Sequence, residues 1–513
     1  MLRRMLLILV GLTLSACGQA TSIPTALPSQ TPTLTVAPSG TPSPTSTPTT
    51  TPTPLPTLGS GPYLMLQSDR DNQQKLMIYD ANGAGRKLIK LPDDSHTDYY
   101  LDNAISPNGQ WLAFYTGSFL THLSAEETRP EQLPITLHLL NLSDGTTRKV
   151  ADVVTDGYEA KLEQLTEKLQ KNNPKDDEAI DPYLFKQSVD TSSVWSPDSH
   201  KLAFAAQING LSSDIYVYDL DTGQIQQVEE SSQSALMIRW SPDGKYIIFK
   251  NSVSYSPDGA TTSLRAVKIG KQVVKEPKIL YSSWFLSSGA WISPQTLLLL
   301  DGSDTAGNFN LRKLNVETGQ ITDLWLGAVS EYAVDDKNQL IVINTGEFAK
   351  LEKRGVYFLS YSGKSVKVLD GIYYLSLFFR GGTKHRFIGV GIGGKTTGYE
   401  VEGIFGLPFD GKEPTSLKHH FDYQHISISP DHAWMLLFDE TSLYLYNKND
   451  ELVKTFPIAG INKIIWRPDS QAIFYSTNNQ LYSLTIPLGA PKLVDQCDLT
   501  YCSFDLENAV WLP

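Results

Sequence analysis

The chain has 513 residues and a formal net charge of −12, with 41% hydrophobic and 10% aromatic residues. This length and apolar content are enough for a large domain with its own core. The acidic balance excludes nucleic acid as an expected partner, because proteins that bind it use basic surfaces to neutralise phosphate. Electrostatic adhesion to anionic lipid is not expected for the same reason.

Residues 1–17 are predicted to be a targeting segment rather than part of the fold. Two arginines precede the apolar run Met5–Leu14, which is too short to span a membrane as a permanent helix. The run ends in Leu14-Ser15-Ala16-Cys17, which resembles the signal of bacterial lipoproteins. The resemblance implies cleavage before Cys17, lipidation of its thiol, and an extracytoplasmic location at the cell surface or in the periplasm. An ordinary signal peptide with an incidental cysteine is the alternative.

Residues 18–61 are rich in Pro, Thr and Ser, and no charged residue occurs between Arg4 and Asp69. This composition does not build a core, and its prolines favour an extended, solvated backbone. About 40 residues at about 3.1 Å each reach on the order of 120 Å. We therefore expect a disordered stalk that holds the following domain away from the membrane.

From residue 62 to 513, apolar strands alternate with a recurring turn, seen most clearly in IRWSPDGKYIIFK at Ile238–Lys250. In Ser241-Pro242-Asp243-Gly244, Pro presets φ, Asp bonds back to the backbone, and Gly adopts the left-handed conformation. Each turn is expected to join two strands, and a third strand and a hairpin into a fourth usually follow. Related turns occur at 106–109, 196–199, 293–295, 429–431 and 467–470.

Four strands per roughly 45 residues is the period typical of a β-propeller blade. The units resemble the WD40-like (PD40) repeats of the TolB type. The resemblance implies an all-β fold, a single propeller of eight or nine four-stranded blades, with degenerate copies at 332–344 and 377–390. Two smaller rings are the alternative.

The two ends of the domain are predicted to pair. Tyr63–Asp69 reads as the second strand of its blade, and the missing first strand is expected at Asn508–Leu512. Completing the first blade with the C-terminal strand closes the ring and removes free sheet edges.

Two inserts interrupt the early blades, at 118–134 and at 155–190. In the second, Tyr158, Leu162 and Leu165 begin a 4, 3, 4 spacing that predicts a helix over about 157–172. This helix either packs over the propeller or docks a partner.

Strand direction alternates within a blade, so first-to-second and third-to-fourth turns share one face, and these are expected to be short. The second-to-third loops and the links between blades share the other face and hold both inserts. Binding residues concentrate on long loops displayed by a rigid scaffold, so this face is the candidate binding face. Its aromatic residues are Tyr99, Tyr100, Tyr183, Phe185, Tyr255, Trp284, Phe285 and Tyr399.

The chain has three cysteines. With Cys17 assigned to the anchor, Cys497 and Cys502 are predicted to form a local disulfide in an oxidising compartment. Free thiols and a metal site are the alternatives, although zinc would need two further ligands. A histidine cluster is a weak candidate for a transition metal, but solvated or packed histidines are the default, so neither a metal nor another cofactor is expected. The cluster consists of His419, His420 and His425, which are predicted to lie in one link between blades.

The sequence contains no G-x-S-x-G, no P-loop and no Rossmann fingerprint. It therefore favours a binding or scaffold module of the bacterial cell envelope over an enzyme. The expected partner is an envelope protein, a peptide or a glycan, bound by a monomeric ring that a lipid anchor attaches to the membrane. The alternative is a hydrolase or lyase whose carboxylates converge from several blades at the mouth of a central channel.

Overall fold

The computed structural model describes most of the strand-forming part of the chain. The predicted signal and the stalk up to Ser60 lie outside the described residues, and so does the insert helix apart from Gly157 and Ala160. Met1–Pro54 is a unit separate from Leu55–Pro513, and only the second unit is described below. The described residues are 61–70, 73–92, 95–97, 101–118, 121–122, 128–129, 132–155, 157, 160, 193–208, 213–230, 235–253, 261–283, 285–302, 309–346, 348–382, 387–394, 401–407, 415–419, 426–477, 479–496 and 503–513.

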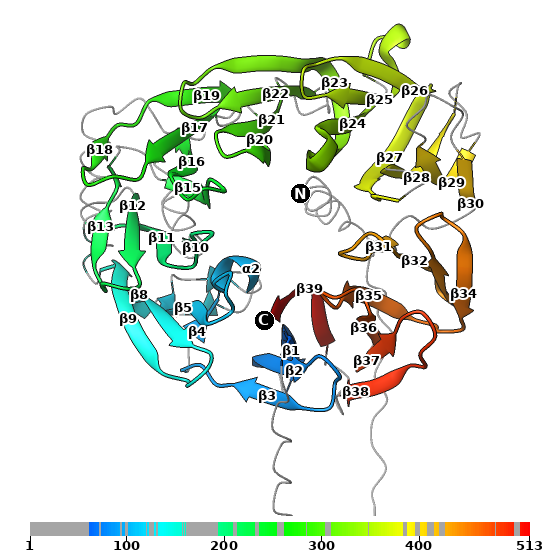
Figure 1. The fold of residues 1–513 in the computed structure, drawn as a ribbon. Coiled ribbons are helices and arrows are strands. Elements are labelled where there is room, and N and C mark those ends of the chain that lie inside the picture. Colours follow the sequence, from blue (N-terminus) through cyan, green and yellow to red (C-terminus); the bar gives the residue numbers. More distant parts are fainter. Residues whose placement is uncertain are drawn as a thin grey trace, which may run out of the picture. The chain divides into compact units, whose positions relative to one another are not determined.

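Successive antiparallel sheets of Leu55–Pro513 stand side by side in a ring, each with one strand at the inner edge and one at the rim (Figure 1). We number these blades in chain order and give their strands from the inner edge outward. Blade 1 contains β39 (Ser503–Leu512), β1 (Tyr63–Arg70), β2 (Gln73–Asp80) and β3 (Arg86–Ile89); blade 2, β4 (Ser95–His96), β5 (Trp111–Ser118), β8 (Gln132–Asn141) and β9 (Thr147–Val154); blade 3, β10 (Ser193–Trp195), β11 (Lys201–Ala206), β12 (Asp214–Asp219) and β13 (Ile225–Gln227); and blade 4, β15 (Ala235–Trp240), β16 (Tyr246–Val253), β17 (Thr261–Lys268) and β19 (Ile279–Ser283).

The next two blades share one seven-stranded sheet, because β23 (Ile321–Asp335) serves both of them. Its first part, up to Val329, pairs with β22, and the part from Val329 onward pairs with β24. Blade 5 contains β20 (Phe285–Ser293), β21 (Thr296–Gly302), β22 (Phe309–Asn315) and the first part of β23; blade 6 contains the rest of β23, β24 (Leu340–Thr345), β25 (Gly355–Ser360) and β26 (Ser365–Asp370).

Three regular blades follow, which brings the described part of the chain to nine blades and decides between the predicted eight and nine. Propellers typically have about 4–8 blades, so this ring is large. Blade 7 contains β27 (Ile372–Phe379), β28 (Phe387–Gly394), β29 (Val401–Leu407) and β30 (Thr415–His419); blade 8, β31 (Ile426–Ile428), β32 (Met435–Phe438), β33 (Leu443–Tyr446) and β34 (Leu452–Phe456); and blade 9, β35 (Ile461–Trp466), β36 (Ala472–Thr477), β37 (Gln480–Thr485) and β38 (Lys492–Gln496).

Short elements occur outside the blades. Two 3₁₀ turns lie in the connections of blade 6, and the pairs β6–β7 and β14–β18 form two-stranded sheets. These elements are η1 (Asp336–Asn338), η2 (Leu351–Lys353), β6 (Thr121–His122), β7 (Thr128–Arg129), β14 (Glu229–Glu230) and β18 (Val274–Lys275).

The ring closes as the sequence predicts, by pairing of the C-terminal strand with the first one. Strand β39 runs antiparallel to β1 from Tyr63↔Leu512 to Asp69↔Ser503, with a register shift between Met65 and Gln67. It is longer than the predicted Asn508–Leu512. The additional residues bury Phe504 and Leu506 against β1 and blade 9, so closure rests on side-chain packing as well as on backbone hydrogen bonds.

The recurring turn has a specific hydrogen-bonding role for its serine and aspartate. In blade 4, Ser241 Oγ donates to Asp243 Oδ1 at 2.7 Å and accepts the Tyr246 N–H at 3.0 Å. The Asp243 carboxylate also accepts the Lys245 N–H. The same arrangement occurs at Ser196 and Ser429. The Ser-Pro-Asp pattern is therefore the signature of a closed turn between the first two strands of a blade.

Indole groups at the ends of inner strands tie one blade to the preceding one. Trp195 Nε1 donates to the Ala104 carbonyl at 3.0 Å, and Trp240 Nε1 donates to the Val194 carbonyl at 2.9 Å. Each tryptophan packs into the core between two blades while its N–H finds a backbone acceptor. Trp195 and Trp240 thus set the spacing of blades 2, 3 and 4.

One expectation about the turns is wrong. We expect an apolar strand before every turn, but the turn at Ser106 follows the short helix α2 (Leu101–Ala104). Leu101 and Ala104 are both buried, and their three-residue spacing suits one face of a helical turn. Among the described residues, the inner edge of blade 2 is therefore the two-residue strand β4, then α2 and a single β-bridge from Ile105 to Leu112 of β5.

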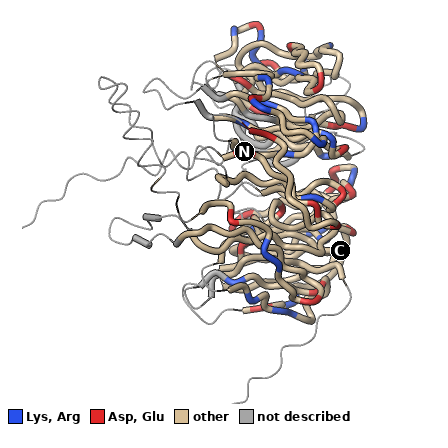
Figure 2. The backbone as a smooth tube through the Cα atoms, turned by 90° about the vertical axis from the view of Figure 1, so that its left-hand side faces the viewer, with Lys and Arg blue, Asp and Glu red and all other residues tan. Residues whose placement is uncertain are grey.

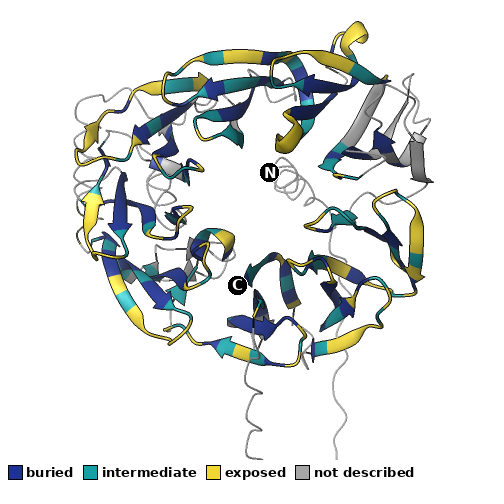
Figure 3. Ribbon diagram, viewed as in Figure 1, coloured by how far each residue is buried: buried dark blue, intermediate teal, exposed yellow. Residues whose placement is uncertain are grey.

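Burial follows the radius of the ring. The middle strands of the blades consist largely of buried residues, whereas rim strands such as β13, β26 and β34 carry the exposed ones (Figure 3). Apolar clusters fill the spaces between blades, for example between blades 2 and 3 and between blades 8 and 9. Lys and Arg are interspersed with Asp and Glu along the described strands (Figure 2).

The expected uniformity of the short turns fails in blade 4. Its third-to-fourth connection is the ten-residue segment 269–278, which carries β18 and pairs it in parallel with β14 of the preceding link. On the predicted binding face, long connections occur between β9 and β10 and between β16 and β17. Long connections are therefore not confined to one face of the ring.

The turn carboxylates make the fold sensitive to acid. The hydrogen bond from the Ser241 hydroxyl lowers the pKa of Asp243 most. Burial raises this pKa, but Lys245 lowers it further, so it stays below its usual range. The folded pKa is thus below the unfolded one, so the carboxylate stabilises the fold fully above about pH 4, and this contribution is lost as the pH falls through the folded pKa.

We expect Asp243→Asn to reduce the difference in stability between pH 7 and pH 3 by about 1 kcal/mol, measured from urea midpoints. The substitution keeps the geometry, because Asn108 accepts a bond from Ser106 Oγ at the same 2.7 Å in the blade 2 turn. An equal loss of stability in both proteins on acidification would contradict this role for the charge.

Candidate functional site

Most residues of the predicted binding face lie outside the described residues. Phe285 is the first residue of β20, and of its side chain nothing is described. The structure therefore neither assembles nor separates this group. The residues outside the description are Tyr99, Tyr100, Tyr183, Phe185, Tyr255, Trp284 and Tyr399, together with Cys17, Cys497, Cys502, His420 and His425.

His419 is placed differently from the prediction. It is the last residue of β30, the rim strand of blade 7, where its backbone pairs with Gly403, rather than part of a link between blades. Among the described residues, no group of three or more His, Cys, Asp or Glu is arranged to hold a metal ion. In the same part of the chain, no helix is both long enough and apolar enough to cross a membrane.

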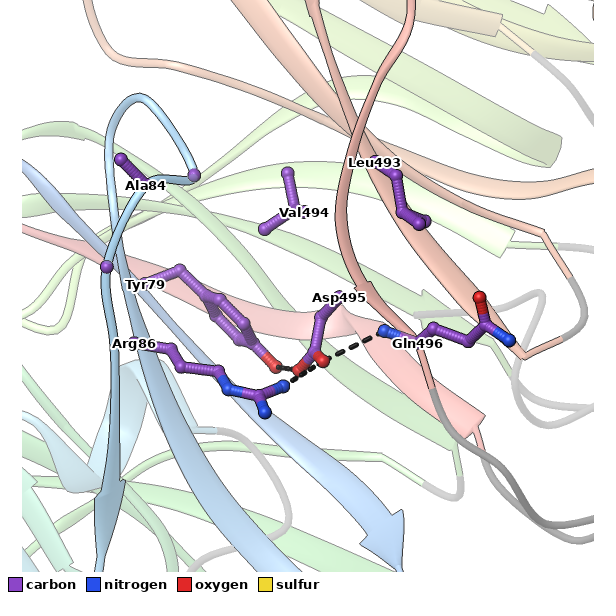
Figure 4. A pocket seen from close by; sticks show the side chains of 9 residues that line it. Tyr79, Ala84, Arg86, Leu493, Val494, Asp495 and Gln496 are labelled. Carbon is purple, nitrogen blue, oxygen red and sulfur yellow. Dashed lines mark hydrogen bonds and ion pairs between the residues drawn. The ribbon is translucent and has the colours of Figure 1, made fainter. Parts of the chain in front are cut away.

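A pocket of about 440 Å³ lies where the ring closes, between the β2–β3 hairpin of blade 1 and β38 of blade 9 (Figure 4). The buried Asp495 carboxylate accepts a hydrogen bond of 2.7 Å from the Tyr79 hydroxyl and forms an ion pair with Arg86. The Gln496 N–H donates to it as well. These contacts join the first and last blades, so we interpret the pocket as part of the closure.

A second site lies between blades 4 and 5, where two cationic side chains share one face of a sheet. Arg239 of β15 pairs in register with Ile248 of β16, and Lys250 lies two residues beyond Ile248 on the same strand. Side chains alternate along a strand, so all three point to the same face. Ile248 packs with the core of blade 5, which shows that this face is directed at blade 5.

The ammonium group of Lys250 reaches across to that blade. Its Nζ donates to the carbonyl of Leu286 in β20 at 2.6 Å, and Lys250 forms no ion pair with a described carboxylate. Burial and then the neighbouring Arg239 lower the pKa of Lys250 to about 8. Burial also lowers the pKa of Arg239, against the influence of Tyr332. The two cations therefore repel each other in a partly desolvated setting.

A tyrosine from blade 6 completes this site. Tyr332 lies on the inner part of β23, and a backbone hydrogen bond joins its phenol to Ala290 of β20. Burial and, to a smaller extent, the Glu331 carboxylate raise the pKa of Tyr332, while this hydrogen bond and Arg239 oppose the shift. A Cβ at Gly289 would collide with the Tyr332 hydroxyl, so the glycine and the register shift between Ser288 and Trp291 make room for the phenol.

We call Arg239, Lys250 and Tyr332 the interblade cluster. It combines a guanidinium, an ammonium and a phenol from blades 4 and 6 around an inner strand of blade 5. Guanidinium and ammonium groups bind carboxylate and phosphate oxygens through charge-assisted hydrogen bonds. The arrangement is thus chemically suited to an anionic group.

Sequence reasoning missed this cluster, although two of its members lie in the stretch that defines the repeat. In the second strand of that stretch, Tyr246, Ile248 and Lys250 are two residues apart and therefore lie on the same face. A lysine that continues an apolar period-two stripe is the signal that could have identified it. Tyr332 carries no comparable signal, because its proximity depends on the packing of three blades.

No family model matches the sequence, and no curated protein matches it either. Among solved structures, the chain is similar to a eukaryotic initiation factor with 11% identity, covering 88% of this chain and 99% of that one at a TM-score of 0.48. It is also similar to TolB from Acinetobacter baumannii, with 16% identity, 59% and 62% coverage and a TM-score of 0.29. A study of two prolyl endopeptidases provides a third match, with 13% identity, 80% and 50% coverage and a TM-score of 0.38.

The chain therefore spans half the length of the prolyl endopeptidase and 62% of TolB. At these identities and TM-scores the matches assign neither a family nor an activity. The strand pairing itself defines the class of this protein as a β-propeller with nine blades in its described part.

Proposed function

We propose that this protein is a lipid-anchored, extracytoplasmic β-propeller that serves the bacterial cell envelope as a binding or scaffold module. The observation that carries the proposal is a closed, well-packed ring bearing long connections, such as residues 155–192 between β9 and β10. Rigid scaffolds that display long loops are a common design for binding sites. The partner is an envelope protein, a peptide or a glycan.

The N-terminal sequence supports the location. The short apolar run that ends at Cys17 resembles a lipoprotein signal, and the Pro/Thr/Ser segment after it suits a stalk. Buried acyl chains contribute about 0.8 kcal/mol per methylene, so several of them give a stable anchor. Outside the cytoplasm, Cys497 and Cys502 form a local disulfide in this proposal.

An enzyme with a carboxylate site at the ring centre is the alternative to this binding role. On the described inner strands, the groups with displaced pKa values are His96, Arg239 and Tyr332. None of them is a carboxylate, whereas the enzyme alternative requires converging acids of perturbed pKa. The C-terminal strand β39 completes blade 1 within the same chain, which favours a monomer.

The anchor is tested with Cys17→Ser in the native host. We expect the unaltered protein to sediment with membranes and its N-terminal peptide to carry acyl chains by mass spectrometry. The variant should be unacylated and largely released from washed membranes. An unaltered protein that carries no acyl chains would contradict the anchor.

The binding role is tested by affinity purification from detergent-solubilised membranes with the intact protein as bait. The control is a variant in which residues 156–174 are replaced by a short Gly-Ser loop. A partner that is retained by the intact protein and lost from the variant would assign docking to this insert. If no protein is enriched and no glycan on an array is bound, the proposed binding role is wrong.

A further inference from the structure

The connection between β24 and β25 of blade 6, residues 346–355, lies on the predicted binding face and is described except for residue 347. We call it the blade 6 loop. It presents two large apolar side chains to solvent, because Phe348 is 56% exposed and Leu351 is 76% exposed. Single exposed apolar residues are common on protein surfaces, but two that are close together in one loop and flanked by charged residues are typical of interaction sites.

The blade 6 loop is held in place from within. Ala349 is buried, and its carbonyl accepts a hydrogen bond of 3.1 Å from Arg354 Nε. The Thr345 hydroxyl lies at the base of the loop and donates to the Lys353 carbonyl at 2.7 Å. The turn η2 of this loop stands as an exposed coil outside the strands of blade 6 (Figure 3). Because the loop is ordered before a partner arrives, docking costs little conformational entropy.

Two lysines flank Leu351 in this loop. Lys350 and Lys353 are both exposed, and Lys353 Nζ lies 5.4 Å from the centre of the Trp325 ring. Among the described residues, neither lysine forms an ion pair with a carboxylate. The loop sequence contains three basic and two acidic residues, in a chain whose net charge is −12. This local excess of positive charge favours a partner surface that carries carboxylates.

The two ends of the described ring lie on the face opposite the blade 6 loop. A Cβ at Gly61 or at Gly109 would collide with Pro513, and Gly109 belongs to the first-to-second turn of blade 2. First-to-second turns share one face of the ring, whereas the blade 6 loop is a second-to-third connection on the other face. A tether that enters at Gly61 therefore leaves Phe348 on the far side of the ring. This placement favours a partner other than the anchoring membrane, as does the acidic balance of the chain.

We propose that Phe348 and Leu351 insert into an apolar pocket of a protein partner, whose carboxylates at the edge of that pocket pair with Lys350 and Lys353. Two apolar side chains offer no hydrogen bonds, so they suit an apolar pocket rather than the hydroxyl groups of a glycan. Aromatic anchors surrounded by a polar rim are typical of protein interfaces. This inference rests on the proposed binding function and selects a protein among its partners.

The test is photo-crosslinking in intact cells of the native host. The photoreactive residue p-benzoylphenylalanine replaces Phe348 in the full chain, and in a control chain it replaces Leu488. Leu488 is a matched control because it is 76% exposed, as Leu351 is, but it lies in the third-to-fourth hairpin of blade 9. We expect one protein adduct from position 348 and none of that mass from position 488. Mass spectrometry then identifies the cross-linked protein and the peptide that contacts position 348.

Variants provide the second measurement, by isothermal titration calorimetry with the purified cross-linked protein. Affinity should fall about tenfold or more in Phe348→Ser and in Leu351→Ser, and it should be unchanged in Leu488→Ser. Lys350→Glu should also weaken binding, more at low salt than at high salt, because an exposed ion pair is screened. Replacing the facing carboxylate of the partner by lysine should restore the affinity of Lys350→Glu. The unfolding midpoints of these exposed variants should match that of the unaltered protein.

The proposal is overturned if position 348 gives no protein adduct, if its adducts are lipid or glycan, or if Phe348→Ser and Leu488→Ser bind the cross-linked protein equally well. Its failure is distinguishable from failure of the proposed function. A partner that the unaltered protein and Phe348→Ser capture equally from solubilised membranes would leave the binding role standing and remove the blade 6 loop from it.

Discussion

Replacing Arg380 by methionine is expected to destabilise the propeller by about 3–5 kcal/mol, the cost of leaving a buried charge without its partner. Arg380 follows β27 in blade 7, and its side chain is fully buried, as is that of Asp450 in blade 8. Its Nε donates to Asp450 Oδ1 at 3.2 Å. This ion pair fastens blade 7 to blade 8.

The guanidinium also satisfies backbone groups of blade 8. It donates to the His432 carbonyl at 2.6 Å and to the Asn447 carbonyl at 2.7 Å. Phe379 lies edge-on to the His432 ring, and a Cβ at Gly381 would collide with that ring. Methionine would leave the Asp450 carboxylate and two carbonyls without these donors. Lysine is expected to recover little of the loss, because one ammonium cannot reproduce the planar fork.

The measurement is the unfolding midpoint by calorimetry and by urea. Lys149→Met is the control, since Lys149 and Asp152 form an exposed ion pair that is expected to contribute about 1 kcal/mol or less. The double variant Arg380→Met, Asp450→Asn should recover part of the stability, because no buried charge is then left alone and asparagine tolerates the left-handed backbone conformation of residue 450. If Arg380→Met and Lys149→Met shift the midpoints equally, the buried pair does not fasten these blades.

The blade architecture could be predicted from the sequence because its determinants are local. Ser, Pro, Asp and Gly close a turn within five residues, and strand periodicity on either side is visible without knowledge of tertiary contacts. Closure was also predictable, since Tyr63–Asp69 lacked a first strand that the C-terminal residues supplied. The number of blades could not be decided between eight and nine without the strand pairing, because β23 continues from one blade into the next without a break.

The candidate site could be predicted only in part, because its geometry is not local. Arg239 and Lys250 are separated by one turn, so their shared face follows from strand alternation. That this face is directed at the Leu286 carbonyl and at a phenol from blade 6 depends on the packing of three sheets. Arg380 is similar: nothing near it in the sequence indicates that Asp450, seventy residues away, lies opposite.

The closing strand provides the second large expected effect. Removing residues 503–513 leaves one edge of β1 without its hydrogen-bonding partner and uncovers the core that Phe504 and Leu506 fill. Exposed strand edges pair with other chains, so we expect the truncated protein to elute as oligomers in size-exclusion chromatography and to lose its cooperative unfolding transition.

A point substitution separates packing from backbone pairing. Leu506→Ala keeps the strand but removes a buried side chain, at an expected cost of about 2–5 kcal/mol, whereas Glu507→Ala on the same strand removes an exposed ion pair with Lys463. A synthetic peptide of residues 501–513 should add to β1 of the truncated chain as a strand and return it to the monomer. A truncated protein that remains monomeric with an unchanged midpoint would show that the ring does not depend on this closure. The pairing of β39 with β1 makes that outcome unexpected, because it joins the two ends of the described ring through a continuous sheet and a shared core.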